Sequence, residues 1–144
     1  MNKFIESSKK ERELMKKLFE RNNVSMYSFT EDDSFDRHDG EYYRKDGQKI
    51  VFEVKNRAVA SNKYRTTVIE KKKYDYLLEY SVKNNCIPMV FIFFSDGVYY
   101  TEDLKTAEKY FTVKRCPKTT AGNNDKIEKE LCEIVIKKTN LFSA

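Results

Sequence analysis

The sequence predicts an α/β fold in which helices flank a central sheet. Apolar residues recur at helical spacing near both ends of the chain, over residues 7–22 and 125–137. Between these segments, strand-prone runs are broken by Asp-Gly pairs at 46–47 and 96–97, which are a strong signal for β-hairpins. The expected order is helix, strand, hairpin, helix, hairpin, strand, helix, and this order is typical of a mixed α/β domain.

The N-terminal part of the chain begins with an amphipathic helix over residues 7–22. Ser7 or Ser8 can cap its first turn, and one face of it contains Glu11, Leu14, Met15 and Leu18 at the spacing i, i+3, i+4, i+7. Loose alternation then predicts a first strand over 24–30. The acidic segment 31–36 is expected to form a loop.

The first hairpin joins residues 41–44 to residues 49–55 through Lys45-Asp46-Gly47-Gln48. Its second strand consists mostly of β-branched and aromatic residues, which fit a pleated and buried surface. We therefore expect residues 50–55 to lie near the centre of the sheet.

The middle of the chain is expected to hold a second helix and a buried strand. Residues 56–67 are small, polar and basic and should form a loop, and a helix should follow over 68–84. Residues 88–94 form an apolar run that begins with proline, which predicts a buried strand. One stripe of the helix would contain Ile69, Lys72, Tyr76 and Tyr80, with Lys73 and Leu77 one position over.

The C-terminal part is expected to complete the sheet and to add a last helix. Strands are predicted over 98–101 and 110–115, and a loop over 117–124 should precede a helix over 125–137. That helix would have Ile127, Leu131, Ile134 and Val135 on one side. Because domains commonly hold ~100–150 residues, we expect residues 1–144 to form a single domain.

Composition narrows the class of protein only a little. The formal net charge of +5 and the pI of about 9.0 fit a nucleic-acid-binding protein, but they also fit a lysine-rich soluble protein. Cys86, Cys116 and Cys132 have no metal-ligand spacing and are expected to be reduced thiols. The sequence contains no apolar run typical of a signal peptide or a membrane span, so we expect a cytoplasmic protein with no membrane partner.

Two opposite charges lie in the most apolar strand of the first hairpin. Side chains alternate along a strand, so Glu53 and Lys55 should point away from Phe52 and Val54. The hairpin should bring Asp39 alongside the end of this strand. Two carboxylates that converge there can hold Mg²⁺ or Mn²⁺, and a neighbouring ammonium group can stabilise negative charge on a phosphate.

The pattern Asp/Glu-x-Lys is not specific by itself, because it occurs three times in this charged sequence, at 53–55, 70–72 and 103–105. Only the first occurrence lies in an apolar strand with an aspartate across a hairpin. The alternative interpretation is a surface ion pair between Glu53 and Lys55.

The segments 35–40 and 51–57 resemble the PD-(D/E)XK nuclease superfamily, which includes Holliday-junction resolvases, phage exonucleases and many restriction enzymes. The resemblance covers roughly residues 7–101 and implies a restriction-endonuclease-like αβββαβ core. That core has a mixed central sheet flanked by helices, to which this chain would add a C-terminal helix. The resemblance implies catalytic roles for Asp39, Glu53 and Lys55, with Mg²⁺ or Mn²⁺ bound by the two carboxylates and DNA as the substrate.

The resemblance also leaves choices between residues. The segment from Glu11 to Leu18 looks like the first helix of archaeal resolvases, which would make Glu11 a catalytic and metal-binding residue; alternatively, it is an ordinary glutamate favoured by the helix dipole. His38 replaces the proline of the family name and is expected to be a bystander rather than a ligand or base. Asp36 competes with Asp39, which is preferred because it adjoins the strand.

The segment 55–73 carries seven basic residues against the single acid Glu70 and can follow a phosphate backbone. Tyr64 can stack on an exposed base, and either Lys72 or Lys73 can face the site. The alternatives are a solvated basic loop and lysines whose stems cover apolar surface. The nucleic-acid-binding residues expected here are Arg57, Lys63, Tyr64, Arg65, Lys72 and Lys73.

The sequence contains no recognisable base-reading motif, so any selectivity should come from nucleic-acid shape, from ends or from a partner protein. DNA is the expected substrate, with RNA as a weaker alternative. By resemblance to the superfamily, the protein can act as a homodimer. The competing function is an inactive nuclease-fold module that binds nucleic acid or a protein.

Overall fold

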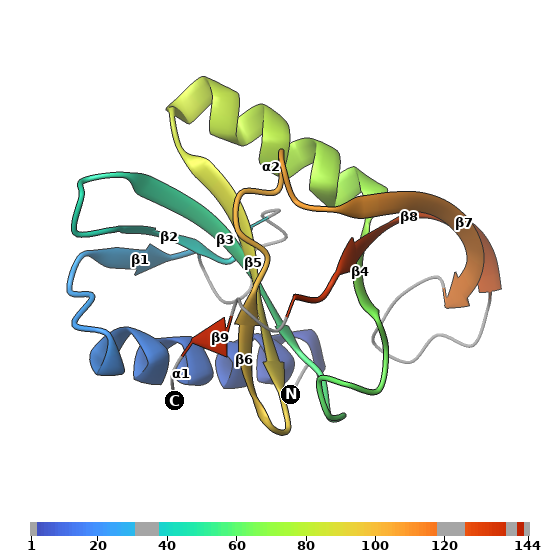
Figure 1. The fold of residues 1–144 in the computed structure, drawn as a ribbon, viewed down its shortest axis with the longest axis horizontal. Helices are drawn as coiled ribbons and strands as arrows, with labels where there is room; N and C mark the ends of the chain where they lie inside the picture. The colour runs from blue at the N-terminus through green and yellow to red at the C-terminus, as the bar shows by residue number, and fades with distance from the viewer. Residues whose placement is uncertain (1–2, 31–37, 118–125, 138–140, 143–144) are drawn as a thin grey trace.

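The computed structural model describes residues 3–30, 38–117, 126–137 and 141–142, which form two helices and nine strands (Figure 1). In chain order these are α1 (Lys3–Arg21), β1 (Tyr27–Phe29), β2 (Gly40–Tyr43), β3 (Lys49–Asn56), β4 (Thr66–Glu70), α2 (Lys71–Asn84), β5 (Ile87–Phe94), β6 (Gly97–Tyr100), β7 (Lys109–Pro117), β8 (Lys126–Val135) and β9 (Leu141–Phe142).

The larger sheet has six strands in the order β1-β2-β3-β5-β6-β9. Only the central pair β3 and β5 is parallel, and every other neighbouring pair is antiparallel. A parallel pair requires a crossover connection, which β4 and α2 provide here. The expected mixed central sheet is confirmed. The chain inserts β4 between β3 and α2, an element that the expected αβββαβ core does not contain.

The two helices cover opposite faces of this sheet. Met15, Leu18 and Phe19 of α1 pack on the β3 face that presents Phe52. On the other face, Leu77 of α2 belongs to a second cluster, which includes Val51 of β3 and the buried part of the second sheet. Period-2 alternation in β3 therefore supplies one wall of each core.

The first half of the chain largely follows the sequence-based expectation. The first helix and the β2–β3 hairpin are confirmed, and the hairpin turn places Gly47 at a φ of +88°, which glycine adopts without strain. The first strand is shorter than expected, at Tyr27–Phe29. The cap prediction is wrong, because Ser7 and Ser8 lie inside α1. The predicted loop over 31–36 lies outside the described residues.

The second helix begins later than expected. Residues 66–70 form β4, whose run Thr-Thr-Val-Ile pairs with β8, so the prediction of a helix from residue 68 is wrong at its start. β-branched residues favour strands, and this pairing decides the outcome. The predicted stripe is also shifted, since Ile69 lies in β4 and Lys72 is exposed. The buried residues of α2 are Tyr74, Leu77 and Ser81.

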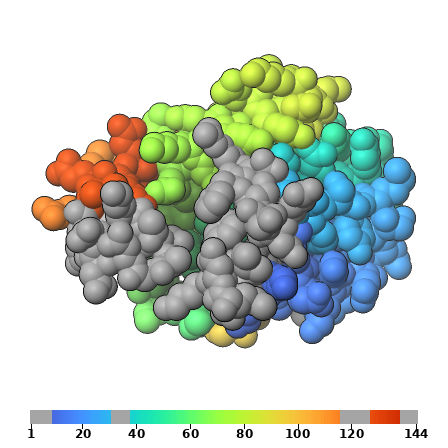
Figure 2. Space-filling view, turned by 180° about the vertical axis from the view of Figure 1, so that it is seen from behind, coloured from blue at the N-terminus to red at the C-terminus, as the bar shows by residue number. Residues whose placement is uncertain are grey.

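The predicted C-terminal helix over 125–137 is wrong. Residues 126–135 form β8, the middle strand of a three-stranded antiparallel sheet with the order β4-β8-β7. Glutamate, lysine and leucine favour helices locally, but pairing with a strand on each side overrides that weak preference. Seen from behind, β7 and β8 form one end of the molecule, opposite the end that holds α1 and β1 (Figure 2). The predicted loop over 117–124 lies almost wholly outside the described residues.

The remaining strands agree with expectation in type and shift in their bounds. The buried strand predicted over 88–94 is β5, the strand predicted over 98–101 is β6, and the strand predicted over 110–115 is β7. Neither of the two helices described here is long and apolar enough to cross a lipid bilayer.

Candidate active site

The C-terminal end of β3 carries the charged residues that the sequence analysis singled out. Phe52 and Val54 belong to the core under α1, whereas Glu53 points toward α2, as strand alternation predicts. Glu53 is only 5% exposed. A carboxylate this deeply buried requires compensating partners, because desolvating an unpaired charge is costly.

Two lysines supply those partners. Lys73 Nζ, from the first turn of α2, donates to Glu53 Oε1 at 3.1 Å, and Lys55 Nζ lies 3.5 Å from the same oxygen. Burial by itself disfavours the charged form of Lys73, but the opposite charge of Glu53 and its hydrogen bond outweigh that effect and raise the pKa of Lys73. The contact between Glu53 and Lys55 is thus part of a buried group of charges and not an isolated surface pair.

Asp39 is fixed beside the same strand by backbone hydrogen bonds. Its N–H donates to the carbonyl of Phe52 at 2.9 Å, and the N–H of Val54 donates to its Oδ2 at 2.6 Å. The next residue, Gly40, lets β2 lie close to β1 and to the Phe52 ring, because a Cβ there would lie 2.3 Å from the carbonyl oxygen of Ser28 and 2.7 Å from that ring. The rival ligand Asp36 lies outside the described residues.

Glu11 reaches the end of β3 from α1. Its Oε2 accepts a hydrogen bond from the N–H of Asn56 at 3.2 Å. Burial raises the pKa of Glu11, the charge of Lys55 opposes this rise, and the charge of Glu53 adds to it. Glu11, Glu53 and Lys55 are therefore close enough to influence one another, and α1 contributes to the same site as the hairpin.

The carboxyl of Asp39 has the most strongly shifted pKa of this group. Burial and the neighbouring charge of Glu53 raise the pKa of Asp39 from 3.8 to about 7, against the lowering effect of the Val54 hydrogen bond. The charge of Glu53 disfavours the ionisation of Asp39, and a bound cation would favour it. Within the described residues, no three His, Cys, Asp or Glu side chains are grouped so that they could hold one metal ion. The carboxyl groups of Asp39 and Glu53 are therefore the candidate pair of metal ligands.

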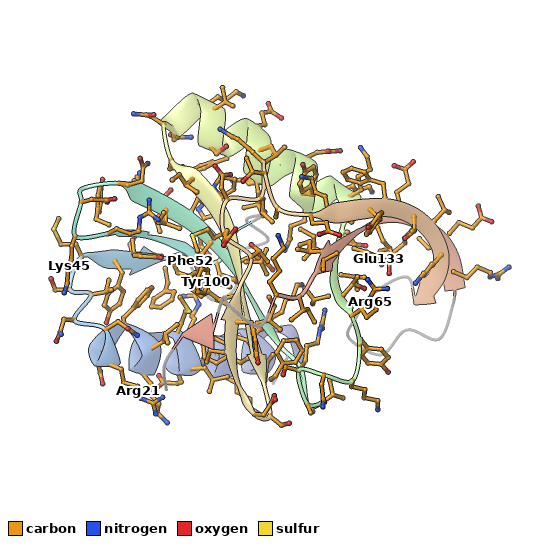
Figure 3. The ribbon with its side chains drawn as sticks, in the orientation of Figure 1. Arg21, Lys45, Phe52, Arg65, Tyr100 and Glu133 are labelled. Atoms are coloured by element: carbon orange, nitrogen blue, oxygen red, sulfur yellow. The ribbon has the colours of Figure 1, made fainter. Side chains whose placement is uncertain are left out.

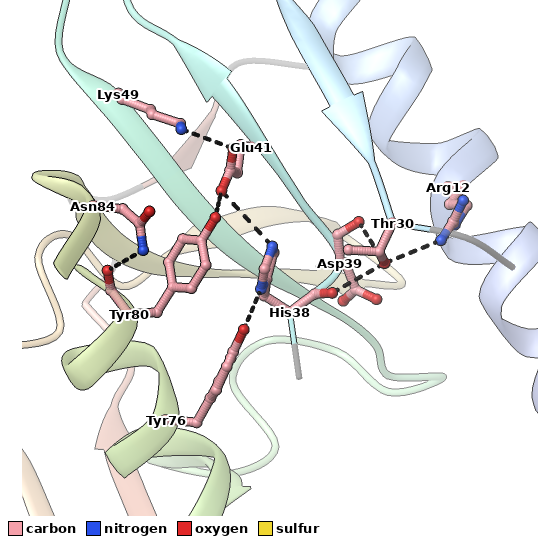
Figure 4. A network of polar contacts seen from close by, with 9 residues as sticks. All are labelled: Arg12, Thr30, His38, Asp39, Glu41, Lys49, Tyr76, Tyr80 and Asn84. Atoms are coloured by element: carbon pink, nitrogen blue, oxygen red, sulfur yellow. Dashed lines mark hydrogen bonds and ion pairs between the residues drawn. The ribbon is translucent and has the colours of Figure 1, made fainter. Parts of the chain in front are cut away.

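A network of polar contacts secures the segment that carries Asp39 (Figure 4). His38 lies next to α2, where its Nδ1 is 3.0 Å from the hydroxyl of Tyr76 and its ring packs on Tyr80 with 4.6 Å between centroids. On the other side, the Thr30 hydroxyl donates to the carbonyl of His38 at 3.1 Å, and Arg12 of α1 donates to that hydroxyl at 3.3 Å. Helix α2 thus contacts His38 directly, and α1 reaches it through Thr30.

Sequence reasoning anticipated that Lys72 or Lys73 could face the site, but it missed the contacts that Tyr76 and Tyr80 of α2 make in this network. Lys73, Tyr76 and Tyr80 contact Glu53, His38 and Glu41 in turn. Their spacing of three and four residues places them on one face of the helix, which was the available signal. His38 had been expected to be a bystander, but it is largely buried and hydrogen-bonded.

The predicted nucleic-acid-binding residues do not all gather at Glu53. Lys73 alone contacts it, whereas Lys72 is exposed. Arg57 follows β3 and donates to the carbonyl of Val68 at 3.3 Å. The other three, Lys63, Tyr64 and Arg65, are exposed along the loop that leads to β4.

Comparison with known proteins shows a likeness of fold. In particular, the structure is similar to that of Hjc, a Holliday junction resolvase from the archaeal hyperthermophile Archaeoglobus fulgidus, with a TM-score of 0.53. The match covers 69% of this chain and 77% of that chain at 12% sequence identity, which is a likeness of fold alone. No protein-family model matches the sequence, and no curated protein matches it significantly.

Proposed function

We propose that the protein is a divalent-metal-dependent nuclease that hydrolyses DNA phosphodiester bonds. The observation that carries this proposal is the buried carboxylate Glu53, held between Lys55 and Lys73 and beside the carboxyl of Asp39. Asp39 has a strongly raised pKa and lies next to a second carboxylate, which is a typical feature of functional sites. The likeness of fold to a Holliday junction resolvase adds support.

The two carboxylates fit Mg²⁺ or Mn²⁺, because hard oxygen ligands suit these ions and Mg²⁺ commonly uses one or two carboxylates together with waters. A cation between Asp39 and Glu53 would relieve their repulsion. When bound, such an ion polarises a phosphate oxygen and lowers the pKa of a bound water. Glu11 is proposed as a further acidic member of the site, although its carboxylate is hydrogen-bonded to the backbone of Asn56.

The lysines have different proposed roles. Lys55, with a quarter of its side chain exposed, is placed to stabilise negative charge that develops on the phosphate. Lys73 holds the carboxylate of Glu53 in orientation through its hydrogen bond. In this proposal Lys55 is a catalytic residue and Lys73 is a positioning residue.

Cleavage assays test the assignment. Linear, circular and four-way-junction DNA would be incubated with the wild-type protein in the presence of Mg²⁺, Mn²⁺ or EDTA. We expect cleavage that EDTA abolishes, and a loss of at least about a hundredfold in rate in Lys55→Ala and Asp39→Asn. Lys105→Ala is the matched control, because it changes the lysine of another Asp-x-Lys pattern that lies on an exposed turn. Undiminished cleavage by Lys55→Ala or Asp39→Asn would refute the assignment.

The finer proposal is a structure-selective endonuclease of the Holliday-junction-resolvase type that acts as a homodimer. A preference for four-way junctions over duplex of the same sequence would support it. Equal cutting of both would remove the resolvase subclass and leave the nuclease. Parallel assays with RNA decide the type of nucleic acid, and sedimentation of the protein with and without DNA decides the oligomeric state.

The alternative function is an inactive nuclease-fold module that binds nucleic acid or a protein. One observation favours it, since a single oxygen of Glu53 already has two ammonium groups around it. In that case Lys55, Lys73 and Glu53 would form a purely structural ion-pair group. Calorimetric titration with Mn²⁺ distinguishes the two, because only the nuclease requires an ion at Asp39 and Glu53.

A further inference from the structure

A pocket of about 350 Å³ opens beside the candidate site, between the loop after β3 and the second sheet. This volume is at the small end of the range for ligand sites, which starts near ~300 Å³. The pocket is lined by Arg57, Ala58, Val59, Tyr64, Thr66, Thr67, Val68, Phe94, Lys114 and Glu133. None of these residues belongs to the group around Glu53.

The pocket lies close to the group around Glu53 along the chain. Arg57 follows Lys55 by two residues, and two residues span at most about 7 Å. The charge of Arg57 also reaches the site, since it is among the influences that lower the pKa of Glu11. The pocket therefore adjoins the end of β3 that carries Lys55.

The side chains that line the pocket favour one kind of ligand over others. Val59, Val68 and Phe94 form apolar walls, and the ring of Tyr64, 60% exposed, stands at the rim. Glu133 supplies a carboxylate whose Oε1 accepts from the Thr66 hydroxyl at 3.3 Å and lies 3.5 Å from Lys114 Nζ. Figure 3 shows Glu133 on β8.

The apolar walls suit a flat ring, and the carboxylate of Glu133 suits a ring that carries an amino donor. Glutamate accepts hydrogen bonds from an exocyclic amino group such as N4 of cytosine, and aromatic side chains stack on bases. Lysine and arginine side chains around the pocket suit the phosphates attached to such a ring. Lys114 and Arg57 belong to the lining, and Lys63 and Arg65 flank Tyr64 in the chain.

We propose that this pocket binds one unstacked nucleobase that carries an exocyclic amino group, next to the phosphate at the candidate site. The inference rests on the proposed function for its choice of ligand. It narrows the substrate to nucleic acid with an unpaired nucleotide near the scissile bond, as at a branch, a gap or a frayed end. A fully paired base would first have to leave the stack.

Binding to single-stranded DNA tests the proposal without any cleavage. Short oligonucleotides with one 2-aminopurine would be titrated in EDTA, and both affinity and fluorescence quenching would be measured. Tyr64→Ala is expected to weaken binding about tenfold and to reduce quenching, because stacking is lost. Tyr110→Ala removes a similarly exposed tyrosine from β7 that does not line the pocket, and it should leave both unchanged.

The preference of the protein for one base over another gives a second test, and its first measurement uses the wild-type protein alone. The wild-type protein should bind cytosine oligonucleotides several-fold more tightly than thymine oligonucleotides, because thymine has no amino group. Glu133→Gln should remove this preference, and Glu128→Gln, an exposed change on the same strand, should retain it. Equal wild-type binding of cytosine and thymine, or binding by Tyr64→Ala that matches Tyr110→Ala, would overturn the proposal.

The outcome is distinguishable from that of the nuclease proposal. If the protein binds cytosine as expected but cuts no DNA, the base-binding pocket is supported and the nuclease function is refuted. If it cuts DNA but its binding depends neither on the base nor on Tyr64, the nuclease function is supported and the base-binding pocket is refuted.

Discussion

The two faces of β3 differ in how they are stabilised. On the α1 side, the ring of Phe52 lies 5.7 Å from that of Phe19 and 6.0 Å from that of Phe91, within a continuous apolar core. On the α2 side, Glu53 is also buried but depends on Lys55 and Lys73.

This contrast between the two faces separates the side chains of β3 that stabilise the fold from those suited to chemistry. Apolar packing is non-directional and tolerates exchange at constant volume. Buried charges depend on named partners and often contribute less stability than an apolar replacement would. Charged residues at the end of such a strand are therefore expected to serve a function, and changes on the two faces should have different consequences.

The largest effect on stability is expected from Phe52→Ala on the α1 face. Phe52 is fully buried, and truncating a buried phenylalanine costs about 3–5 kcal/mol through lost burial and the remaining cavity. Urea unfolding followed by circular dichroism would measure the loss. Val82→Ala, at a 72% exposed position on α2, should change stability by less than about 0.5 kcal/mol. Similar losses in both variants would contradict the packing described for this face.

The elements predicted correctly from sequence are those set by local signals. The β2–β3 hairpin follows from its Asp-Gly turn and from alternation in β3, and β5 follows from an apolar run opened by proline. β4, in the middle of the chain, pairs with β8 near its C-terminal end, from Thr66 with Val135 to Glu70 with Leu131. Such long-range pairing leaves no local mark, and the residues of β8 fit helical spacing equally well. This is why the last helix was predicted wrongly.

The candidate site likewise has one part that follows from local signals and another that depends on long-range pairing. Asp39, Glu53 and Lys55 belong to one hairpin, so their mutual placement could be predicted. Whether Lys72 or Lys73 faces Glu53 depends on where α2 begins, and the pairing of β4 determines that boundary. The contact between His38 and Tyr76 joins two elements with no common local pattern, so sequence alone could not reveal it.

A smaller loss is expected from Lys73→Met on the α2 face. This change leaves the buried carboxylate of Glu53 with Lys55 alone, and about 2 kcal/mol of stability should be lost, because Lys73 is partly exposed and the full cost of breaking a buried pair does not apply. The double variant Glu53→Gln/Lys73→Met should regain at least about half of that loss. Urea unfolding of both variants measures this coupling.

Lys72→Met is the matched control for that cycle, because it changes the neighbouring lysine, whose side chain is exposed on the same turn. It should change the free energy of unfolding by less than about 0.5 kcal/mol. If Lys73→Met behaves like Lys72→Met, the Glu53–Lys73 pair contributes nothing to the fold.

The most specific effect is the pH dependence expected from Asp39. Its carboxyl has a pKa of about 7 in the folded protein against 3.8 for an ordinary aspartate, so between these values the folded state binds more protons than the unfolded state. The free energy of unfolding of the wild-type protein must then fall as pH rises from about 4 to 8 through this group. Asp39→Asn removes the titration and keeps an oxygen that can accept from Val54.

Thermal unfolding at pH 8 should therefore find Asp39→Asn more stable than the wild type, and at pH 4 the advantage should vanish, since both side chains are then neutral in the folded protein. Glu20→Gln, on the exposed side of α1, should give the same small difference at both pH values. Adding Mg²⁺ at pH 8 should stabilise the wild type and leave Asp39→Asn nearly unchanged, because a cation stabilises the ionised carboxyl. The opposite outcome would be that, without metal, the wild type becomes more stable relative to Asp39→Asn as pH rises. In that case burial and Glu53 do not disfavour the ionised carboxylate of Asp39, and the electrostatic argument for a cation site at the end of β3 fails.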